Sequence, residues 1–241
     1  MKIKLMSFNI QHARNYNYPD EDRIDIGLTA NVIASQGADI VGLNEVRGAG
    51  EDTAKYTDQA KEIAALIGYN YYFAPAINIE HHGLYGNALL SRFPITDGEI
   101  IAVPDPEDRV HGRGFETRCI LKAVVNTAKP LTIFVTHFGL NPSEADNAAS
   151  TAVQALADSN SPKVLMGDFN LLPESPILDR IRIAMADTAD MLNTLKFSYP
   201  SDNPIKKIDY IFVSDDIKVV EADIPAVIAS DHRPHTAVIE I

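Results

Sequence analysis

The chain has 241 residues and is 46% hydrophobic, which is ordinary for a globular protein with a sizeable core. No run approaches the ~18 consecutive apolar residues of a membrane span. The formal net charge is −12, and the basic residues are scattered apart from a modest cluster of Arg109, Arg113 and Arg118. A protein that grips duplex DNA usually presents a basic stripe, so this charge disfavours a polyanionic partner and, weakly, an anionic membrane surface.

No linker, charge block or repeat divides the chain, and we expect a single domain over residues 1–241. Met1–Lys4 leads directly into an apolar run, so no signal peptide is expected. The lone cysteine, Cys119, allows no intramolecular disulfide, and its apolar neighbours predict a buried structural thiol. These features favour a reducing compartment, and we expect a cytoplasmic protein.

Helical periodicity predicts three helices, in chain order residues 23–36, 57–67 and 143–157. The first two are followed by Gly37 and Gly68, and glycine is typical of a helix end. The third follows Pro142 and starts at Ser143, a residue favoured at helix N-termini.

Apolar runs rich in β-branched residues predict strands between these helices. They cover residues 3–5, 40–43, 69–73, 100–103, 120–125, 131–135, 164–166, 209–213 and 227–228. Helices and strands that alternate in this way indicate an α/β or α+β fold.

Polar side chains gather close to the ends of the predicted strands. Six clusters share this placement: Ser7–Asn9, Leu43–Glu45, Thr136–His137, Gly167–Asn170, Ile208–Tyr210 and Ser230–His232. A strand end is a rigid support that can present one polar group accurately. The clusters supply carboxylates for a hard cation, amides for phosphoryl oxygens and imidazoles for proton transfer. This combination fits metal-assisted phosphoester hydrolysis better than any other common reaction.

In chain order, these clusters and the segment Gly86–Ile95 resemble the endonuclease/exonuclease/phosphatase superfamily, which includes DNase I, exonuclease III, neutral sphingomyelinases and inositol polyphosphate 5-phosphatases. The resemblance extends from Ser7 to His232. It implies a DNase I-like four-layer α/β/β/α sandwich, in which two mixed β-sheets pack together with helices outside. It also implies an active site at one end of the sheets and hydrolysis of phosphoesters with a divalent metal.

Glu45 is the main candidate metal ligand, because a carboxylate at the end of the apolar run 40–43 is costly to bury without a cation. Mg²⁺ or Mn²⁺ is expected, since both prefer a few carboxylate oxygens and retain several waters. The resemblance implies that Asn9 belongs to the metal site, orients its carboxylate and contacts phosphate. It also implies that Asp231 is a metal ligand or lies next to one.

Asp168 and Asn170 flank Phe169, and in an extended segment they share the face opposite to Phe169. The resemblance implies that Asp168 orients or deprotonates the attacking water, while Asn170 holds a phosphoryl oxygen. It further implies that Asp209 fixes one ring nitrogen of His232. The other nitrogen then faces phosphate, and His232 acts either as a base or as a stabilising cation.

The element Thr136–His137 is similar to the DNase I, sphingomyelinase and inositol phosphatase branches, where the histidine contacts phosphate and can protonate the leaving oxygen. No acidic partner for His137 is evident near Tyr85–Asn87, so the resemblance supports phosphate contact more than a general-acid role. Glu116 and Arg118 resemble a pair that points into the groove, with Arg118 expected to bind substrate. A surface ion pair is the alternative.

Loops 11–22, 78–85 and 104–114 are expected to set specificity, and His81, His82 and His111 are expected to be solvated loop histidines. The leading hypothesis is a Mg²⁺-dependent phosphodiesterase or phosphatase that acts on a small or lipid-head-group phosphate. The sequence implies no partner protein. One alternative is a nuclease of the DNase I or exonuclease III type. The other is a non-catalytic binding module on the same fold.

Overall fold

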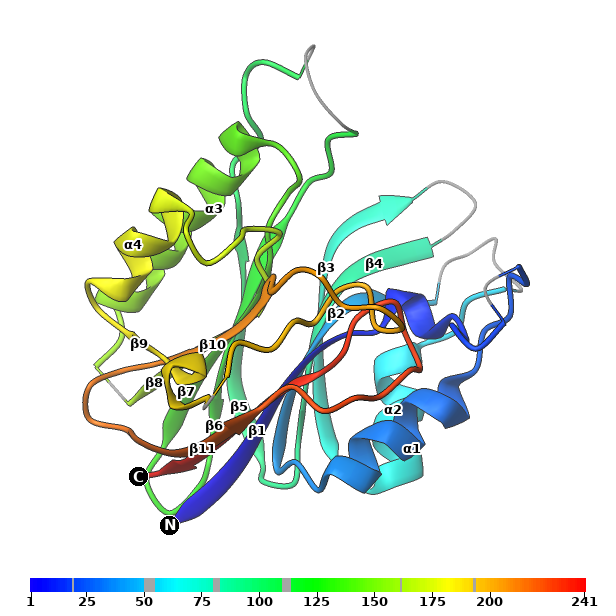
Figure 1. Ribbon diagram of the computed structural model, residues 1–241, viewed down its shortest axis with the longest axis horizontal. Helices are drawn as coiled ribbons and strands as arrows, with labels where there is room; N and C mark the ends of the chain where they lie inside the picture. The colour runs from blue at the N-terminus through cyan, green and yellow to red at the C-terminus, as the bar shows by residue number, and fades with distance from the viewer. Residues whose placement is uncertain (19, 50–54, 80–82, 110–113, 161, 193) are drawn as a thin grey trace.

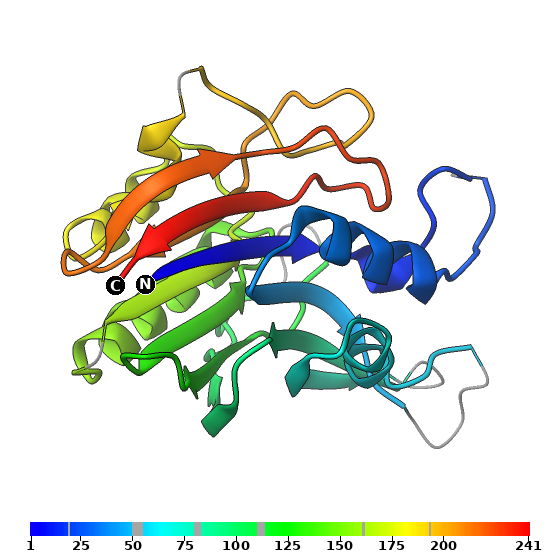
Figure 2. The same ribbon diagram turned by 90° about the horizontal axis from the view of Figure 1, so that it is seen from below.

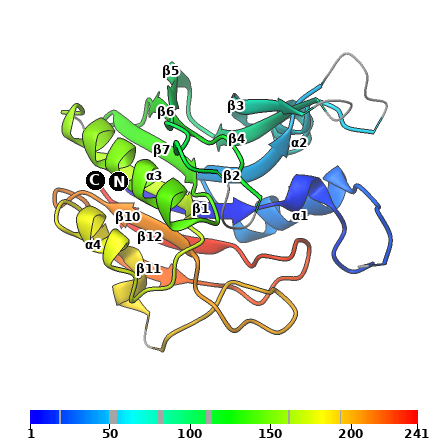
Figure 3. The same ribbon diagram turned by 90° about the horizontal axis from the view of Figure 1, so that it is seen from above.

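In a computed structural model of the chain, two six-stranded mixed sheets pack face to face, and helices cover both outer faces (Figures 1 and 3). The structure describes residues 1–18, 20–49, 55–79, 83–109, 114–160, 162–192 and 194–241. This arrangement confirms the predicted α+β class and the four-layer α/β/β/α sandwich. None of the helices in the described ranges has the length and apolarity that a membrane crossing requires.

The first sheet has the strand order β11-β12-β1-β2-β4-β3, and Figure 2 shows β1 between β12 and β2. Its strands are β1 (Lys2–Asn9), β2 (Ile40–Arg47), β3 (Asn70–Ile79), β4 (Gly83–Ser91), β11 (Lys218–Asp223) and β12 (His235–Glu240). Only β1 and β2 run parallel among these described strands.

The second sheet has the order β5-β6-β7-β8-β10-β9. Its strands are β5 (Ile95–Ala102), β6 (Cys119–Val125), β7 (Leu131–His137), β8 (Lys163–Asp168), β9 (Ala186–Asp187) and β10 (Asp209–Val213). Here β7 and β8 form the parallel pair. Each sheet therefore contains one parallel pair, and each pair needs a crossover helix.

The crossovers are α1 (Ile26–Gln36) between β1 and β2, and α3 (Pro142–Ala157) between β7 and β8. The other described helices are α2 (Gln59–Ile67), α4 (Pro176–Arg182), and the short 3₁₀ turns η1 (Gln11–Ala13) and η2 (Thr188–Met191). Because parallel strands end at the same edge of a sheet, β1 and β2 present Asn9 opposite Asn44, and β7 and β8 present His137 opposite Asp168. The antiparallel neighbour β10 adds Asp209 opposite Asp168.

Three apolar layers hold the sandwich together. Side chains such as Leu5, Val135 and Met166 fill the space between the sheets. A second cluster lies between the first sheet and α1 and α2, and a third lies between the second sheet and α3 and α4. The sheets approach closely at Gly42, where an added Cβ would lie 2.7 Å from Met166 Sδ. Cys119 is buried, as predicted.

The three predicted helices are confirmed, with starts that move by one to three residues. The carboxylate of Asp25 accepts from the Leu28 backbone N–H, so the first helix begins at Ile26. Gly37 and Gly68 adopt left-handed conformations with φ of 62° and 73° and end α1 and α2. The Glu144 carboxylate accepts from the Asn141 backbone N–H, which completes the start of α3.

The predicted strand at residues 227–228 is wrong. Residues 224–230 lie in a connection between β11 and β12, and the Val227 backbone N–H donates to the Pro225 carbonyl. Pro225 has no N–H for a ladder, and regular pairing resumes only at His235, after Pro234. The cluster Ser230–His232 therefore precedes a strand and does not follow one.

Gly167→Ala should destabilise the protein by at least about 3 kcal/mol, because an added Cβ would lie 1.8 Å from the Thr136 carbonyl oxygen and Gly167 has a φ of 150°. Urea denaturation followed by circular dichroism measures this loss. Gly114→Ala is the matched control, since its Cβ would meet nothing within 4 Å. Equal stability of the two variants would contradict the close approach of β7 and β8.

Candidate active site

The predicted site residues from both sheets converge on one pocket of about 620 Å³. Seven of them line it: Glu45, Arg118, His137, Asp168, Asn170, Asp231 and His232. Asn9 and Asp209 are fully buried and hydrogen-bond to members of this set. Residues that are up to 223 positions apart, Asn9 and His232, thus share one site.

A β-bulge in β2 turns Glu45 toward the pocket. In a regular strand, Asn44 and Glu45 would face opposite sides of the sheet. The pairing of β2 with β4 shifts between Leu43 and Val46, and Glu45 has a φ of 58°. Asn44 then reaches the second sheet while Glu45 enters the pocket, and bulges of this kind are common beside active sites.

Asn9 holds two carboxylates in place. Its Nδ2 donates to Glu45 Oε1 at 3.0 Å and to Asp168 Oδ2 at 3.1 Å, while its Oδ1 accepts from the Gln11 backbone N–H. The amide nitrogen of Asn9, and not its oxygen, therefore faces Glu45. This geometry matches an orienting residue better than a direct metal ligand.

Asp168 is 1% exposed and lies at the centre of the cluster. Its Oδ1 accepts from the Asn170 backbone N–H at 2.9 Å, and its own backbone N–H donates to Asn44 Oδ1 at 2.9 Å. Burial raises the pKa of Asp168 to about 7, and the nearby Asp209 adds to this shift. Phe169 points away into the helix-covered core, as the alternation predicts.

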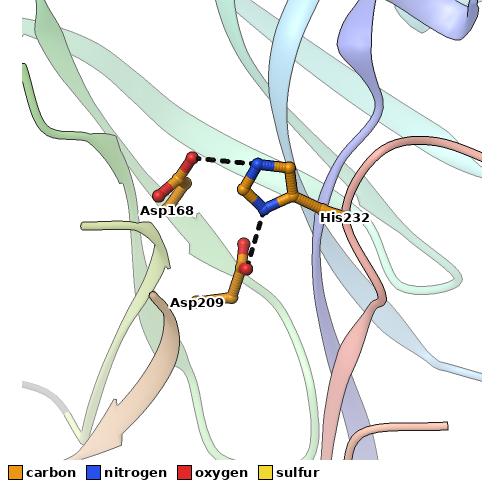
Figure 4. A group of neighbouring side chains, drawn as sticks. All are labelled: Asp168, Asp209 and His232. Carbon is orange, nitrogen blue, oxygen red and sulfur yellow. Dashed lines mark hydrogen bonds and ion pairs between the residues drawn. The ribbon is translucent and has the colours of Figure 1, made fainter. Parts of the chain in front are cut away.

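His232 lies between two carboxylates, with Nδ1 2.9 Å from Asp209 Oδ2 and Nε2 3.6 Å from Asp168 Oδ2 (Figure 4). Burial alone would lower the pKa of His232, but Asp209 and Asp168 outweigh it and raise the pKa to about 10. The imidazole is therefore positively charged at neutral pH. One atom from each of these three residues lies within 4.8 Å of the others, a spacing that could also hold a metal.

His137 lies between a basic and an acidic side chain, since its Nε2 is 3.5 Å from Asp168 Oδ2. Arg118 Nη1 lies 3.0 Å from His137 Nδ1, and a guanidinium can only donate. Nδ1 must then accept, which leaves the proton of the neutral ring on Nε2. Burial, followed by the charges of Arg118 and His232, lowers the pKa of His137 well below its usual value, so the ring stays neutral.

Two N–H donors consequently lie side by side in the pocket. His137 Nε2 is 3.2 Å from Asn170 Nδ2, which also donates to the Phe138 carbonyl at 3.0 Å. Asn170 has a φ of 51°, and this left-handed conformation brings its amide back toward His137. Arg118 is 9% exposed, and its Nη2 pairs at 3.4 Å with Glu116, whose side chain is half-buried.

The opposite wall carries the carboxylates of Glu45 and Asp231, whose burial the positive charge of His232 offsets only in part. Burial raises the pKa of Glu45 and of Asp231, and each carboxylate lies near other acids. His12 Nδ1 is 3.9 Å from Glu45 Oε2, but burial and the charges of Arg47 and Lys55 lower the pKa of His12 to about 4. His12 is thus neutral and does not offset the charge of Glu45.

These carboxylates fit a hard divalent cation. Gln11 Nε2 donates to Asp231 Oδ2 at 3.0 Å, whereas Gln11 Oε1 is buried with no hydrogen-bond partner among the described residues. Gln11 starts a left-handed turn with φ of 44°, and such a conformation costs about 1–2 kcal/mol. Oxygen ligands in an acidic pocket are what Mg²⁺ and Mn²⁺ prefer.

Sequence reasoning missed several residues of this site. Asn44 Nδ2 donates to Asn87 Oδ1 at 2.8 Å and to the Thr136 carbonyl at 2.9 Å, which links the two sheets. Tyr199 packs its ring 4.9 Å from that of His232, in a segment with no motif. The available signal for Asn44 was its place in the cluster Leu43–Glu45, directly after an apolar run, where a polar side chain is expected to be buried and hydrogen-bonded.

Of the other basic and histidine residues singled out in the sequence, Arg109 alone lies in the described part of the chain. Arg109 pairs with Asp105, which also accepts from Thr117 Oγ1. Arg113, His81, His82 and His111 lie outside the described residues.

Comparison with known proteins identifies the relatives of this chain. The model of the endonuclease/exonuclease/phosphatase family matches residues 6–232. Among curated proteins, none matched the sequence. A family protein from Beutenbergia cavernae DSM 12333 has a TM-score of 0.79 and 23% identity, covering 100% of this chain and 72% of that one.

Two further solved structures share the fold. A mannosyl-6-phosphatase from Bacteroides thetaiotaomicron has a TM-score of 0.80 and 17% identity, covering 99% of this chain and all of the other. The catalytic domain of human Nocturnin with bound sulfate has a TM-score of 0.75 and 18% identity, covering 99% and 93%.

Asp209→Asn should lower the pKa of His232, because it removes the charge beside Nδ1 and keeps an acceptor there. The charged pair contributes about 2 kcal/mol. Since the pKa is raised on folding, this contribution is fully present below pH ~6.5 and is lost as pH rises through about 10. Unfolding of the metal-free proteins should show a smaller difference in unfolding free energy between wild type and Asp209→Asn at pH 10.5 than at pH 6.5. An unchanged difference would contradict the charged pair.

Arg118→Met should release His137 Nδ1 and raise the pKa of His137, because one of the charges that lower it is removed, and ¹⁵N NMR of the imidazole would detect this rise. Turnover should fall about 10- to 100-fold, as is typical when a residue that orients a functional side chain is lost. Arg118→Lys keeps one donor, so turnover should fall less in this variant. Arg92→Met, at a surface ion pair with Asp39, is the control. An unchanged pKa of His137 in Arg118→Met would contradict this role.

Proposed function

This chain belongs to the endonuclease/exonuclease/phosphatase family, and we propose that it is a divalent-metal-dependent hydrolase that cleaves a small phosphate ester. The observation that carries the proposal is the convergence of three groups in one pocket. These are the acidic wall with Glu45 and Asp231, the Asp209–His232 pair beside Asp168, and the paired donors of His137 and Asn170.

Glu45 and Asp231 are the residues we assign to Mg²⁺ or Mn²⁺, with Asn9 holding Glu45 in position. A bound cation would stabilise negative charge that develops on the phosphoryl group. The raised pKa values of both carboxylates support this assignment, because an adjacent cation favours their ionised forms. Gln11 supports it as well, since its buried Oε1 is a spare oxygen ligand on the same wall.

Asp168 is the residue we assign to the attacking water. A carboxylate with a pKa of about 7 is suited to accept a proton near neutral pH. Its oxygens are held by Asn9 and by the Asn170 backbone, so the carboxylate is oriented before substrate binds. Asp168 also lies between the acidic wall and the two histidines. A phosphoryl group bound by these residues would therefore be close to the Asp168 carboxylate.

His137, Asn170 and His232 are the residues we assign to the phosphoryl oxygens. Two neighbouring N–H donors, on His137 Nε2 and Asn170 Nδ2, suit one such oxygen. His232 is held as a cation by Asp209, which favours electrostatic stabilisation of the transition state over a role as the base. His137 is neutral and accepts from Arg118, so it acts as a donor and not as a proton source for the leaving group.

Pocket size and charge favour a small substrate. The volume of about 620 Å³ lies within the range of about 300–1,000 Å³ that is usual for small-molecule sites. The net charge of −12 disfavours a polyanion. The same fold carries a mannosyl-6-phosphatase, so this architecture is compatible with a small phosphate ester.

Turnover should require a divalent cation and stop in excess chelator. At 100 times its dissociation constant, Mg²⁺ should raise the unfolding free energy by about 2.7 kcal/mol. Glu45→Gln should abolish this stabilisation, whereas His232→Gln should retain it and lose turnover. Titration calorimetry with Mn²⁺ and thermal denaturation measure both effects, with Glu62→Gln, on the exposed face of α2, as control. Equal loss of metal binding in both site variants would show that their roles are misassigned.

A substrate panel tests the proposed activity. It contains 4-nitrophenyl phosphate, bis(4-nitrophenyl) phosphate, sphingomyelin and plasmid DNA, each with Mg²⁺, with Mn²⁺ and with chelator. A small ester should be hydrolysed, and duplex DNA should be cut negligibly at physiological salt. Plasmid nicking with a steep salt dependence, lost in Asp168→Asn, would instead identify a nuclease.

A further inference from the structure

Two of the exposed large apolar side chains in the described part of the chain are leucines at the pocket. Leu140 is 48% exposed and Leu172 is 40% exposed, and both line the same pocket as the polar cluster. Ile208 lines it as well, from the start of β10. These three residues, here called the leucine wall, belong to connections at β7, β8 and β10, which are neighbours in the second sheet.

The leucine wall is held in place by the core beneath it. Phe138 and Phe169, which start the two leucine-bearing loops, pack with ring centroids 4.6 Å apart. Asn170 Nδ2 donates to the Phe138 carbonyl, so one hydrogen bond ties the loops together. Gly139 lies against Glu144, where an added Cβ would be 2.4 Å from Cδ. These contacts hold the two loops that carry the leucines in place.

The wall begins where the phosphate contacts end. Leu140 follows His137 by three residues, and Leu172 follows Asn170 by two, so each leucine shares a loop with one proposed phosphoryl donor. Glu45 on β2 and Asp231 just before β12, both from the first sheet, line the same pocket. Those carboxylates suit a cation or water, and an apolar group would gain nothing there. A phosphate held by the donors would direct its organic group along the leucines.

Building on the proposed function, we infer that the substrate is a phosphoester with an apolar organic group, and that Leu140, Leu172 and Ile208 form the subsite for that group. In the reaction, water adds its oxygen to phosphorus and the P–O bond to the alcohol breaks. The departing alcohol oxygen takes up a proton, and water supplies it. Burial of the apolar group against the wall raises affinity in proportion to the area covered.

Two substrate series test the inference while leaving the reacting bond unchanged: n-alkyl phosphates and n-alkyl 4-nitrophenyl phosphates with two to eight carbons. We expect kcat/KM in the hydrolysed series to rise about two- to fourfold for each methylene until the wall is covered. Hydrolysis without any dependence on chain length would overturn the inference and leave the proposed function standing.

Binding measured without turnover separates the apolar subsite from the proposed hydrolase function. The n-alkylphosphonates have a C–P bond that water does not cleave, so calorimetry with Mg²⁺ reports binding alone. Octylphosphonate should bind at least ~30-fold more tightly than ethylphosphonate. Tight, length-dependent binding with no hydrolysis of any ester would refute the proposed function alone. Equal affinities would refute the subsite.

Variants of the exposed leucines locate the effect. Leu140→Asn with Leu172→Asn should flatten the chain-length dependence of affinity and of kcat/KM, with little change for the ethyl compounds. Leu66→Asn, at a leucine on α2 that is 64% exposed, is the matched control. A chain-length dependence that persists in the double variant would overturn the assignment to this wall.

The apolar group could belong to a free ester or to a membrane lipid. Hexadecyl phosphate in phosphatidylcholine vesicles, compared with octyl phosphate in solution, distinguishes these sources. Turnover of the soluble ester alone would support a free substrate, and turnover of both would support a lipid. Failure with both, while ethyl phosphate is hydrolysed, would refute the apolar subsite.

Discussion

The buried carboxylate of Asp168 receives hydrogen bonds from both sheets, and the arrangement of the site depends on how this charge is held. Asn9 donates to it from the first sheet, and the Asn170 backbone donates from the second. His232 lies on its other side as a cation supported by Asp209. Even so, burial raises its pKa to about 7. The charge is therefore only partly compensated, and such a group is costly to a fold but useful to catalysis.

A second constraint fixes the distance between the sheets at the site. Asn44 contacts the backbone of both β7 and β8, because its Oδ1 accepts from Asp168 and its Nδ2 donates to Thr136. Asn87 continues the link by donating to the Cys119 carbonyl at 2.9 Å. Buried amides of this kind have few alternative partners, so they define one register. Glu45 from the first sheet and His137 from the second are thereby held around a single pocket.

Much of this could be predicted from local pattern, and the remainder depends on contacts between distant segments. Gly37 and Gly68 ended their helices as expected, and the alternation around Phe169 placed Asp168 and Asn170 on one face. Alternation fails at Glu45, because a bulge with φ of 58° redirects the side chain. The cation beside His137 is Arg118, 19 residues earlier, and no local signal marks that pair. Residues 227–228 look like a strand by composition, but they lie in a connection that follows Pro225, and pairing resumes only at His235.

Water labelled with ¹⁸O tests most directly whether the pocket activates water for attack on phosphorus. An ester hydrolysed in the panel would be converted with Mg²⁺ or Mn²⁺ in H₂¹⁸O, and ³¹P NMR would locate the label. We expect one ¹⁸O atom on the phosphate product of each turnover, with label incorporation lost in chelator and in Asp168→Asn. Label in the released alcohol would mean that the C–O bond breaks. That result, or undiminished incorporation in Asp168→Asn, would contradict the assignment of Asp168 to the attacking water.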